Sequence, residues 1–270
     1  MSYLDEAGTV RVAAAARAFG SAQPFPHLVV DGVLRPEIAS ALASGFPPVD
    51  AQLWKHHLHR NAHKFACNRQ EAMPALFRQV VAELNAPPFL RVLEEVTGIG
   101  PLLADPDLEG GGLHQIQAGG FLKVHADFNV HPRSRLHRRL NLLVYLNPVW
   151  DEAWDGNLEL WAADLSGCRR SIAPVLNRAV LFSTTDLAFH GHPRPLRTPS
   201  GVTRKSLALY YYTQDRPAAE RAPAHSTLYR HTAGEAPLAH LLRLAPRYLF
   251  SSTAPRQLFG SAVRRFRGRP

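Results

Sequence analysis

The segment FLKVHADFNVH (residues 121–131) contains side chains that bind metal ions in many proteins. His125 and Asp127 are two residues apart, and residues two apart on a β-strand point to the same face of a sheet. An imidazole and a carboxylate on one face supply two of the three ligands of a 2-His-1-carboxylate site, which leaves other coordination positions open. The second histidine must come from a distant segment, and DLAFHGHPRP offers His190 or His192.

Ordinary surface histidines are the simple alternative, because the chain has 14 histidines and an HxD pair can arise by chance. A second histidine-rich stretch, HHLHRNAH, provides His59 and His63 at the i, i+4 spacing of a zinc-binding helix. Arg60 stands where a zinc protease has glutamate, and no second cluster completes such a site. We therefore expect residues 51–70 to form a polar, irregular loop at the mouth of the metal site.

The elements before residue 105 are expected to be one strand and several helices. PFPHLVVDGVL (residues 24–34) is rich in β-branched residues and ends at a turn signal, which predicts a strand. RPEIASALASGF (residues 35–46) has proline in its first turn and apolar residues at helical spacing. Two more helices are predicted at residues 71–85 and 89–97, the second ending at Gly98.

The elements after residue 105 are expected to be short strands between turns. Many short strands without intervening helices are typical of an antiparallel sandwich or jelly roll. The expected strands are LHQIQ (113–117), FLKVHADF (121–128), RLNLLVYLN (139–147), GNLELW (156–161), RAVLFS (178–183) and KSLALYYYT (205–213).

Composition limits the class of protein. The 270 residues are 46% hydrophobic, which is enough for one large domain. No apolar run is long enough to cross a membrane, and acidic residues precede the alanine-rich start, so neither a transmembrane segment nor a signal peptide is expected. Cys67 and Cys168 are too few for a disulfide framework, which favours a reducing, cytoplasmic location.

Positive charge is concentrated near the end of the sequence. Residues 216–270 hold ten arginines and two glutamates, whereas the rest of the chain is nearly neutral. The segment APLAHLLRLAPRYLF (residues 236–250) predicts a basic helix that docks on its parent domain or, alternatively, lies on an anionic membrane or contacts nucleic acid. We expect an N-terminal segment (residues 1–23), a main domain (residues 24–215) and an arginine-rich C-terminal extension (residues 216–270).

A family resemblance rests on the order of these motifs. HxD, LLVYLNPVWDEAWDGNLELW, FHGHP and TRKSLALYYY follow one another between residues 113 and 213. This pattern resembles the iron(II)- and 2-oxoglutarate-dependent oxygenases of the prolyl hydroxylase type, and the likeness extends over residues 24–213. It implies a β-rich α+β fold, a double-stranded β-helix (jelly roll), here with N-terminal flanking helices and a C-terminal basic helical tail. It also implies Fe(II), with 2-oxoglutarate and O2 as cosubstrates and ascorbate as a further candidate reductant.

The resemblance assigns metal ligands residue by residue. It implies that His125 and Asp127 bind iron, with His190 as the third ligand and His192 as the alternative. Related halogenases lack the carboxylate, so Asp127 favours hydroxylation or another oxidation over halogenation.

The resemblance also implies where 2-oxoglutarate binds. Arg204 matches the basic residue that pairs with the distal carboxylate, and Ser206 shares its strand face. Tyr145 matches a tyrosine whose hydroxyl bonds the same carboxylate, although a core tyrosine is the alternative. The gap from His190 to Arg204 is longer than in many relatives, and the usual GGxL is replaced by a sequence with a single glycine, Gly156.

The implied function is a 2-oxoglutarate-dependent dioxygenase that hydroxylates an unidentified substrate, consumes O2 and releases succinate and CO2. The substrate is a small metabolite, a lipid or glycan precursor, or a peptidyl side chain. Two alternatives are a nucleic-acid-directed oxygenase or RNA-binding protein that uses the basic tail, and a non-catalytic β-helix scaffold.

Overall fold

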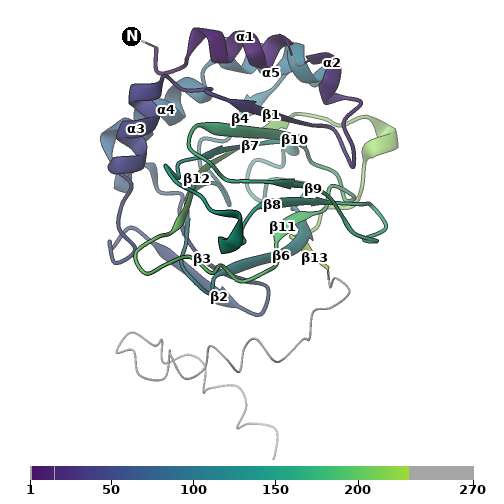
Figure 1. Cartoon of the computed structure of the whole chain (residues 1–270). Helices are drawn as coiled ribbons and strands as arrows, with labels where there is room; N and C mark the ends of the chain where they lie inside the picture. Colours follow the sequence, from purple (N-terminus) through teal and green to yellow (C-terminus); the bar gives the residue numbers. More distant parts are fainter. Residues whose placement is uncertain (1, 15, 231–270) are drawn as a thin grey trace, which may run out of the picture. The chain divides into compact units, whose positions relative to one another are not determined.

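The computed structural model describes residues 2–14 and 16–230. The helices of this part precede most of the strands and lie along one side of the molecule (Figure 1). They are α1 (Glu6–Ala14), α2 (Ala16–Phe19), α3 (Pro36–Ser44), α4 (Ala75–Leu84) and α5 (Pro87–Thr97), with single 3-10 turns η1 (Gln70–Ala72), η2 (Glu152–Trp154) and η3 (Ala218–Glu220).

Thirteen strands of the described chain form one curled sheet, and every strand pair in it is antiparallel. Its main path runs β1-β10-β7-β12-β5-β3-β6-β11-β8-β9, with β2, β4 and β13 attached to β3, β12 and β6. The strands are β1 (His27–Asp31), β2 (Lys55–His59), β3 (Ala62–Cys67), β4 (Leu103–Ala104), β5 (Gly112–Ile116), β6 (Phe121–Ala126), β7 (His137–Tyr145), β8 (Leu158–Trp161), β9 (Cys168–Ile172), β10 (Arg178–Ser183), β11 (His190–His192), β12 (Arg204–Thr213) and β13 (Leu228–Tyr229).

This topology confirms the predicted jelly roll. Strands far apart in sequence are neighbours, so that β6 from the first half of the domain lies beside β11 from the second. In Figure 1 the sheet folds over so that β1, β10 and β7 lie under the helices and β3, β6 and β11 form the opposite wall.

The two faces of the central strands have different roles. On β7, Leu142 and Val144 point outward and join the apolar core formed with the helices. On β12, Leu207 and Leu209 do the same, with Tyr211 between the sheet and α4, where its hydroxyl donates to the Leu84 carbonyl at 3.0 Å. Because strand side chains alternate, the intervening residues point into the sheet's interior, where a site can form.

The predicted helices and strands before residue 105 are largely confirmed. The predicted strand contains β1, and the three predicted helices correspond to α3, α4 and α5. Gly98 ends α5 in the left-handed conformation, with φ of 68°, and its N–H donates to the Glu94 carbonyl.

The expectation for residues 51–70 is wrong in part. Instead of an irregular loop, Lys55–His59 and Ala62–Cys67 pair as the hairpin β2–β3, and β3 joins the sheet between β5 and β6. The hairpin was missed because polar side chains occupy both faces of these strands, which removes the apolar–polar alternation by which a strand is recognised.

The described part of the arginine-rich extension packs against the sheet. β13 pairs with β6, and the Asn129 side chain donates to the Pro223 carbonyl at 2.9 Å and accepts from the His225 N–H at 3.0 Å. Arg216 is buried and donates to the Arg138 carbonyl at 3.0 Å. The helix predicted at residues 236–250 lies outside the described residues.

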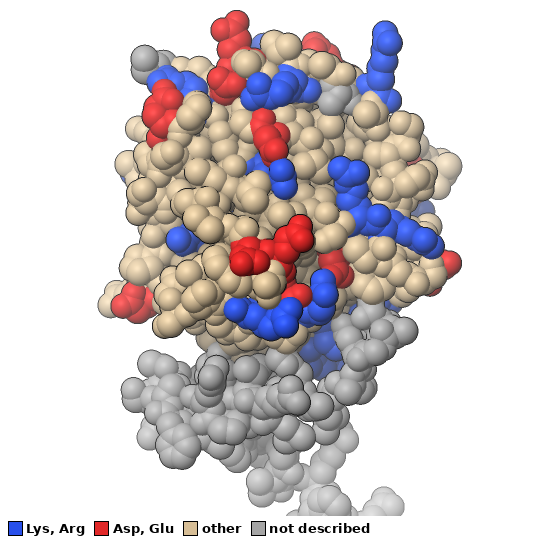
Figure 2. Space-filling model, in the orientation of Figure 1, with Lys and Arg blue, Asp and Glu red and all other residues tan. Residues whose placement is uncertain are grey.

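The surface view shows acidic and basic side chains interspersed on one face, without a continuous basic area among the described residues (Figure 2). Ion pairs among the described residues include Arg194 with Glu159 at 3.2 Å and Arg197 with Asp155 at 2.7 Å. None of the described helices is long and apolar enough to cross a membrane.

Asn177 provides a test of how the sheet edge is stabilised. It precedes β10 with a φ of +61°, and its side chain accepts from the Leu34 N–H at 2.9 Å and donates to the Leu34 carbonyl at 2.7 Å. Asn177→Ala removes two buried hydrogen bonds and places alanine in the left-handed backbone conformation. We expect this substitution to lower the free energy of unfolding, measured by urea denaturation, by about 2–4 kcal/mol. Gln79→Ala is the control, because it removes one exposed hydrogen bond from Tyr3. It should change the free energy of unfolding by about 0.5 kcal/mol or less. Similar losses in the two variants would contradict this account.

Candidate metal centre

Three of the predicted residues meet inside the sheet. His125 lies on β6, Asp127 follows this strand by one residue, and His190 begins β11, directly opposite His125 in the strand register. The Asp127 carboxylate lies 3.5 Å from Nε2 of each histidine, and one ligand atom from each residue lies within 4.8 Å of the other two. All three side chains are at least nine-tenths buried.

The hydrogen bonds of His125 and His190 use Nδ1 of each ring and leave Nε2 for a metal. Nδ1 of His125 lies 2.8 Å from the Lys123 carbonyl, and Nδ1 of His190 lies 3.0 Å from the Ala188 carbonyl. A carbonyl oxygen only accepts, so each Nδ1 carries a proton, and Nε2 is the nitrogen of each ring that faces Asp127 and can bind a metal. Burial, together with the neighbouring His125 ring, lowers the pKa of His190 to about 4. The three groups therefore fit a divalent metal ion.

The carboxylate is fixed by two partners that the sequence analysis missed. Arg138 donates to Asp127 Oδ2 at 3.0 Å, and the Asn141 side-chain amide donates to the same oxygen at 2.7 Å. The Arg138 guanidinium is itself held between the Phe128 and Tyr210 rings, 4.5 and 3.4 Å from their centres. Burial raises the pKa of the Asp127 carboxyl, but the Arg138 guanidinium and the two histidines outweigh this effect and hold the pKa well below its usual value.

A local irregularity brings the ligands together. Opposite β11, His190 pairs with His125 but His192 pairs with Leu122, so β6 has one additional residue over this interval. Leu122 and His125 therefore both line the interior, whereas strict alternation would place Lys123, not Leu122, on the same face as His125. Gly191 allows this close packing, because a Cβ at this position would lie 2.9 Å from the Leu122 and Lys123 carbonyl oxygens.

A second group of metal-binding residue types, Asp105, Asp107 and His131, lies elsewhere in the described chain. Nδ1 of His131 accepts from the backbone N–H groups of Arg133 and Ser134, at 3.2 and 3.1 Å. The proton must then be on Nε2, which points to Asp105 at 3.4 Å. This tautomer has no lone pair to offer a metal, so the group forms a structural His–Asp pair.

Arg204 lies in the same cavity as the three ligand residues, which has a volume of about 350 Å³. Its guanidinium donates to the Tyr145 hydroxyl at 3.0 Å and to the Gly156 carbonyl at 2.7 Å. Ser206, which also lines the cavity, is the cross-strand neighbour of Tyr145. The structure thus brings together all three residues expected to bind the cosubstrate, and burial raises the pKa of Tyr145, which keeps its hydroxyl protonated.

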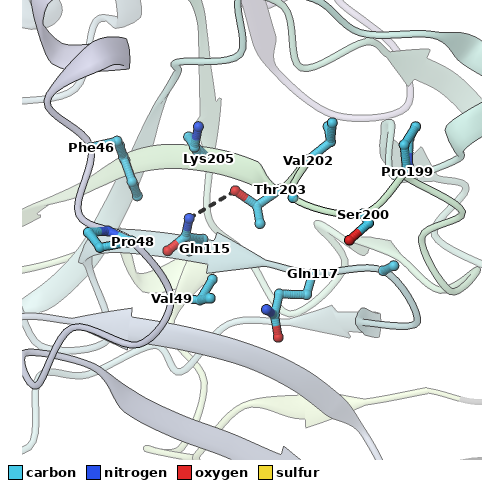
Figure 3. A pocket seen from close by; sticks show the side chains of 12 residues that line it. Phe46, Pro48, Val49, Gln115, Gln117, Pro199, Ser200, Val202, Thr203 and Lys205 are labelled. Carbon is cyan, nitrogen blue, oxygen red and sulfur yellow. Dashed lines mark hydrogen bonds between the residues drawn. The ribbon is translucent and has the colours of Figure 1, made fainter.

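Lys205 points away from this cavity, as the strand alternation predicts. It lines a different hollow of about 550 Å³ on the other face of the sheet, shown in Figure 3, where its Nζ lies 6.0 Å from the centre of the Phe46 ring. Gln115 lies in the same hollow and donates to Thr203 at 2.8 Å. The neighbouring His114 lines the metal-site cavity instead.

His192 also lines the metal-site cavity, although it is not in the group of three. It is 3% exposed, and neither ring nitrogen has a hydrogen-bond partner among the described residues. Burial and the nearby Arg204 lower its pKa well below the usual value. A neutral, buried ring without a partner is suited to bind a ligand that enters the cavity.

Comparisons with known proteins concern the family and the fold. Residues 111–212 match the family described as the 2OG-Fe(II) oxygenase superfamily. A prolyl-4-hydroxylase from Pseudomonas putida has a similar fold, with a TM-score of 0.53 and 17% identity over 76% of this chain and 100% of that chain. A collagen prolyl hydroxylase from Paramecium Bursaria Chlorella virus-1, in complex with 2OG, gives a TM-score of 0.47 and 14% identity over 70% of this chain and 96% of that one. No curated protein matches the sequence.

The family-model match agrees with the resemblance seen in the sequence, and the structure at 17% identity agrees in fold. The matched residues 111–212 include His125, Asp127 and His190, the group that could hold a metal ion.

The buried pair of Arg138 and Asp127 gives a testable expectation for the metal-free protein. Arg138→Met keeps an apolar side chain between the two aromatic rings but leaves the carboxylate without its cation. Removing one partner of a buried ion pair should lower the free energy of unfolding by about 3–5 kcal/mol, measured by urea denaturation. Arg139→Met is the matched control, because Arg139 pairs with the half-exposed Glu220 at 3.1 Å, and it should cost about 1 kcal/mol. Equal losses at the two positions would show that the Asp127 pair has no special role.

Proposed function

We propose that this protein hydroxylates a substrate at an iron(II) ion held by His125, Asp127 and His190, using O2 and 2-oxoglutarate and releasing succinate and CO2. The observation that carries the proposal is the convergence of these three groups in one buried cavity with Arg204. Two neutral imidazoles and one carboxylate leave three positions of an octahedral metal open, which is the arrangement that oxygen-activating iron sites need. A carboxylate at Asp127 occupies the position that a chloride ion needs in a halogenase, which favours hydroxylation.

Iron(II), when bound, would supply the activation of O2 that couples oxidation of the substrate to decarboxylation of 2-oxoglutarate. The protein's contribution is to orient the metal ligands and to exclude water from the cavity. Arg138 and Asn141 hold one oxygen of Asp127, which leaves Oδ1 free for the metal. Backbone carbonyls fix both imidazole rings, so no ligand has to reorient when a metal enters.

Arg204 and Tyr145 are proposed to bind the distal carboxylate of 2-oxoglutarate. The guanidinium is buried and aligned by its bonds to the Tyr145 hydroxyl and the Gly156 carbonyl. A buried cation needs a partner of opposite charge, and none of the described carboxylates forms an ion pair with Arg204. Ser206 and His192 add polar groups in the same cavity.

The assignment of the ligands predicts a difference between two neighbouring histidines. Purified protein supplied with Fe(II), 2-oxoglutarate and O2 should form succinate slowly without its substrate. Asp127→Ala and His190→Ala should abolish this turnover and weaken Co(II) binding, measured by calorimetry, by about 100-fold, because each removes a ligand. His192→Ala should retain Co(II) binding.

Thermal unfolding of each variant would establish that it is folded. Retained metal binding in His190→Ala together with lost binding in His192→Ala would reverse the assignment. A wild-type protein that binds no metal would favour the scaffold alternative.

Arg204 predicts a separate effect on the cosubstrate. Arg204→Ala should raise the KM for 2-oxoglutarate by about 100-fold, because a buried charge-assisted pair is lost, and it should leave Co(II) affinity within about threefold. Arg204→Lys should retain part of the affinity, since the charge remains but the forked geometry is lost. Lys205→Ala is the control on the opposite face of the same strand and should leave the KM unchanged. Equal losses of metal and 2-oxoglutarate affinity in Arg204→Ala would contradict the proposed role.

A further inference from the structure

Lys64 is a cation of the metal-site cavity that the proposed function does not use. Lys64 lies on β3, in the wall between β5 and β6, and its side chain lines the cavity that contains the ligand residues. Among the carboxylates of the described residues, none is within ion-pair distance of its ammonium group. Burial lowers the pKa of Lys64 to about 8, although the more distant Asp127 carboxylate partly opposes this effect. An ammonium group in this position is desolvated without being neutralised.

The paired strand β2 adds two further groups to the same wall. Lys55 and His57 both line the cavity, and His57 lies directly opposite Lys64 in the strand register. Burial and the two neighbouring lysines lower the pKa of His57 to about 4, so that the ring is neutral at pH 7 and adds a hydrogen-bonding group beside the two ammonium groups. The hairpin therefore forms a wall of hydrogen-bond donors and positive charge.

Two other charged groups of the cavity are already matched. Arg138 pairs with Asp127, and Glu109 lies 3.9 Å from Arg133 at the cavity's edge. The two carboxylates of 2-oxoglutarate would be matched by the metal and by Arg204. With the cosubstrate bound, the Lys64 ammonium would still lack a counter-ion, and the remaining component of the reaction is the substrate.

We infer that the substrate carries an oxyanion, a carboxylate or a phosphate group, which Lys64 binds with His57 and Lys55 while the carbon to be hydroxylated faces the metal. The inference rests on the proposed function and names the class of substrate for that site. An anion beside a partly desolvated ammonium gains a strong charge-assisted hydrogen bond, and this bond would orient the substrate in the cavity. A neutral or cationic substrate would leave Lys64 unpaired in the reactive complex.

Binding of small anions tests this inference without knowledge of the substrate. The enzyme is loaded with Ni(II) and saturating 2-oxoglutarate, so that the metal and Arg204 are occupied, and is titrated at low salt with methyl phosphate and, separately, with acetate. Calorimetry should detect saturable binding of at least one anion. Binding of methyl phosphate alone would indicate a phosphorylated substrate, and binding of acetate alone would indicate a carboxylate.

Substitutions of single lysines test where the anion binds. Lys64→Gln should weaken binding of the anion by about tenfold or more, and Lys64→Arg should restore most of it because the charge returns. Lys205→Gln, which removes a lysine from the hollow on the other face, should bind the anion as the wild type does. Thermal unfolding of each loaded variant would verify that it is folded.

Three outcomes would overturn the inference: no anion binding by the loaded wild type, equal binding by wild type and Lys64→Gln, or a loss of 2-oxoglutarate affinity in Lys64→Gln as large as in Arg204→Ala. The last outcome would assign Lys64 to the cosubstrate. Failure of the wild type to bind Ni(II) or 2-oxoglutarate would instead contradict the proposed function itself, so the two failures are distinguishable.

Discussion

The site depends on one buried carboxylate. Asp127 accepts hydrogen bonds from Arg138 and Asn141 and faces the Nε2 atoms of two histidines. A carboxylate removed from water is stable only when cations or donors surround it. The Arg138 guanidinium serves this purpose in the metal-free protein, and the same contact leaves the other carboxylate oxygen free. Stability of the fold and readiness to bind a metal therefore come from the same interaction.

The alternation of strand side chains separates these polar groups from the apolar core. Leu142 and Leu209 pack against the helices, while Asn141 and Tyr210 on the same strands face the cavity. The outward layer provides most of the apolar burial that stabilises the sheet. The inward layer can then hold charged groups that contribute less to stability, because the strands that carry them are fixed by the helices behind.

Charge is distributed unevenly around the cavity. Arg204 and the metal ligands lie on strands of the central sheet, whereas Lys55 and Lys64 lie on the β2–β3 hairpin. β12 and β3 flank β5 in the sheet, so Arg204 and Lys64 line the same side of the cavity, one strand apart. A cavity with more than one cation that lacks a carboxylate partner can bind two anionic groups, as the proposed anionic substrate and 2-oxoglutarate would require.

The sequence by itself determined the residue types of the site and the order of its elements. His125 and Asp127 are two residues apart on a strand, and this local spacing is enough to put them on one face. The sequence resemblance already favoured His190 over His192, but the capture of the Asp127 carboxylate by Arg138 and the place of Lys64 in the cavity wall were decided by the tertiary structure alone. Each depends on the register between strands that are distant in sequence, and one additional residue in a strand changes which side chains point inward. That register is set by packing and hydrogen bonds across the whole sheet, which no local pattern of residues contains.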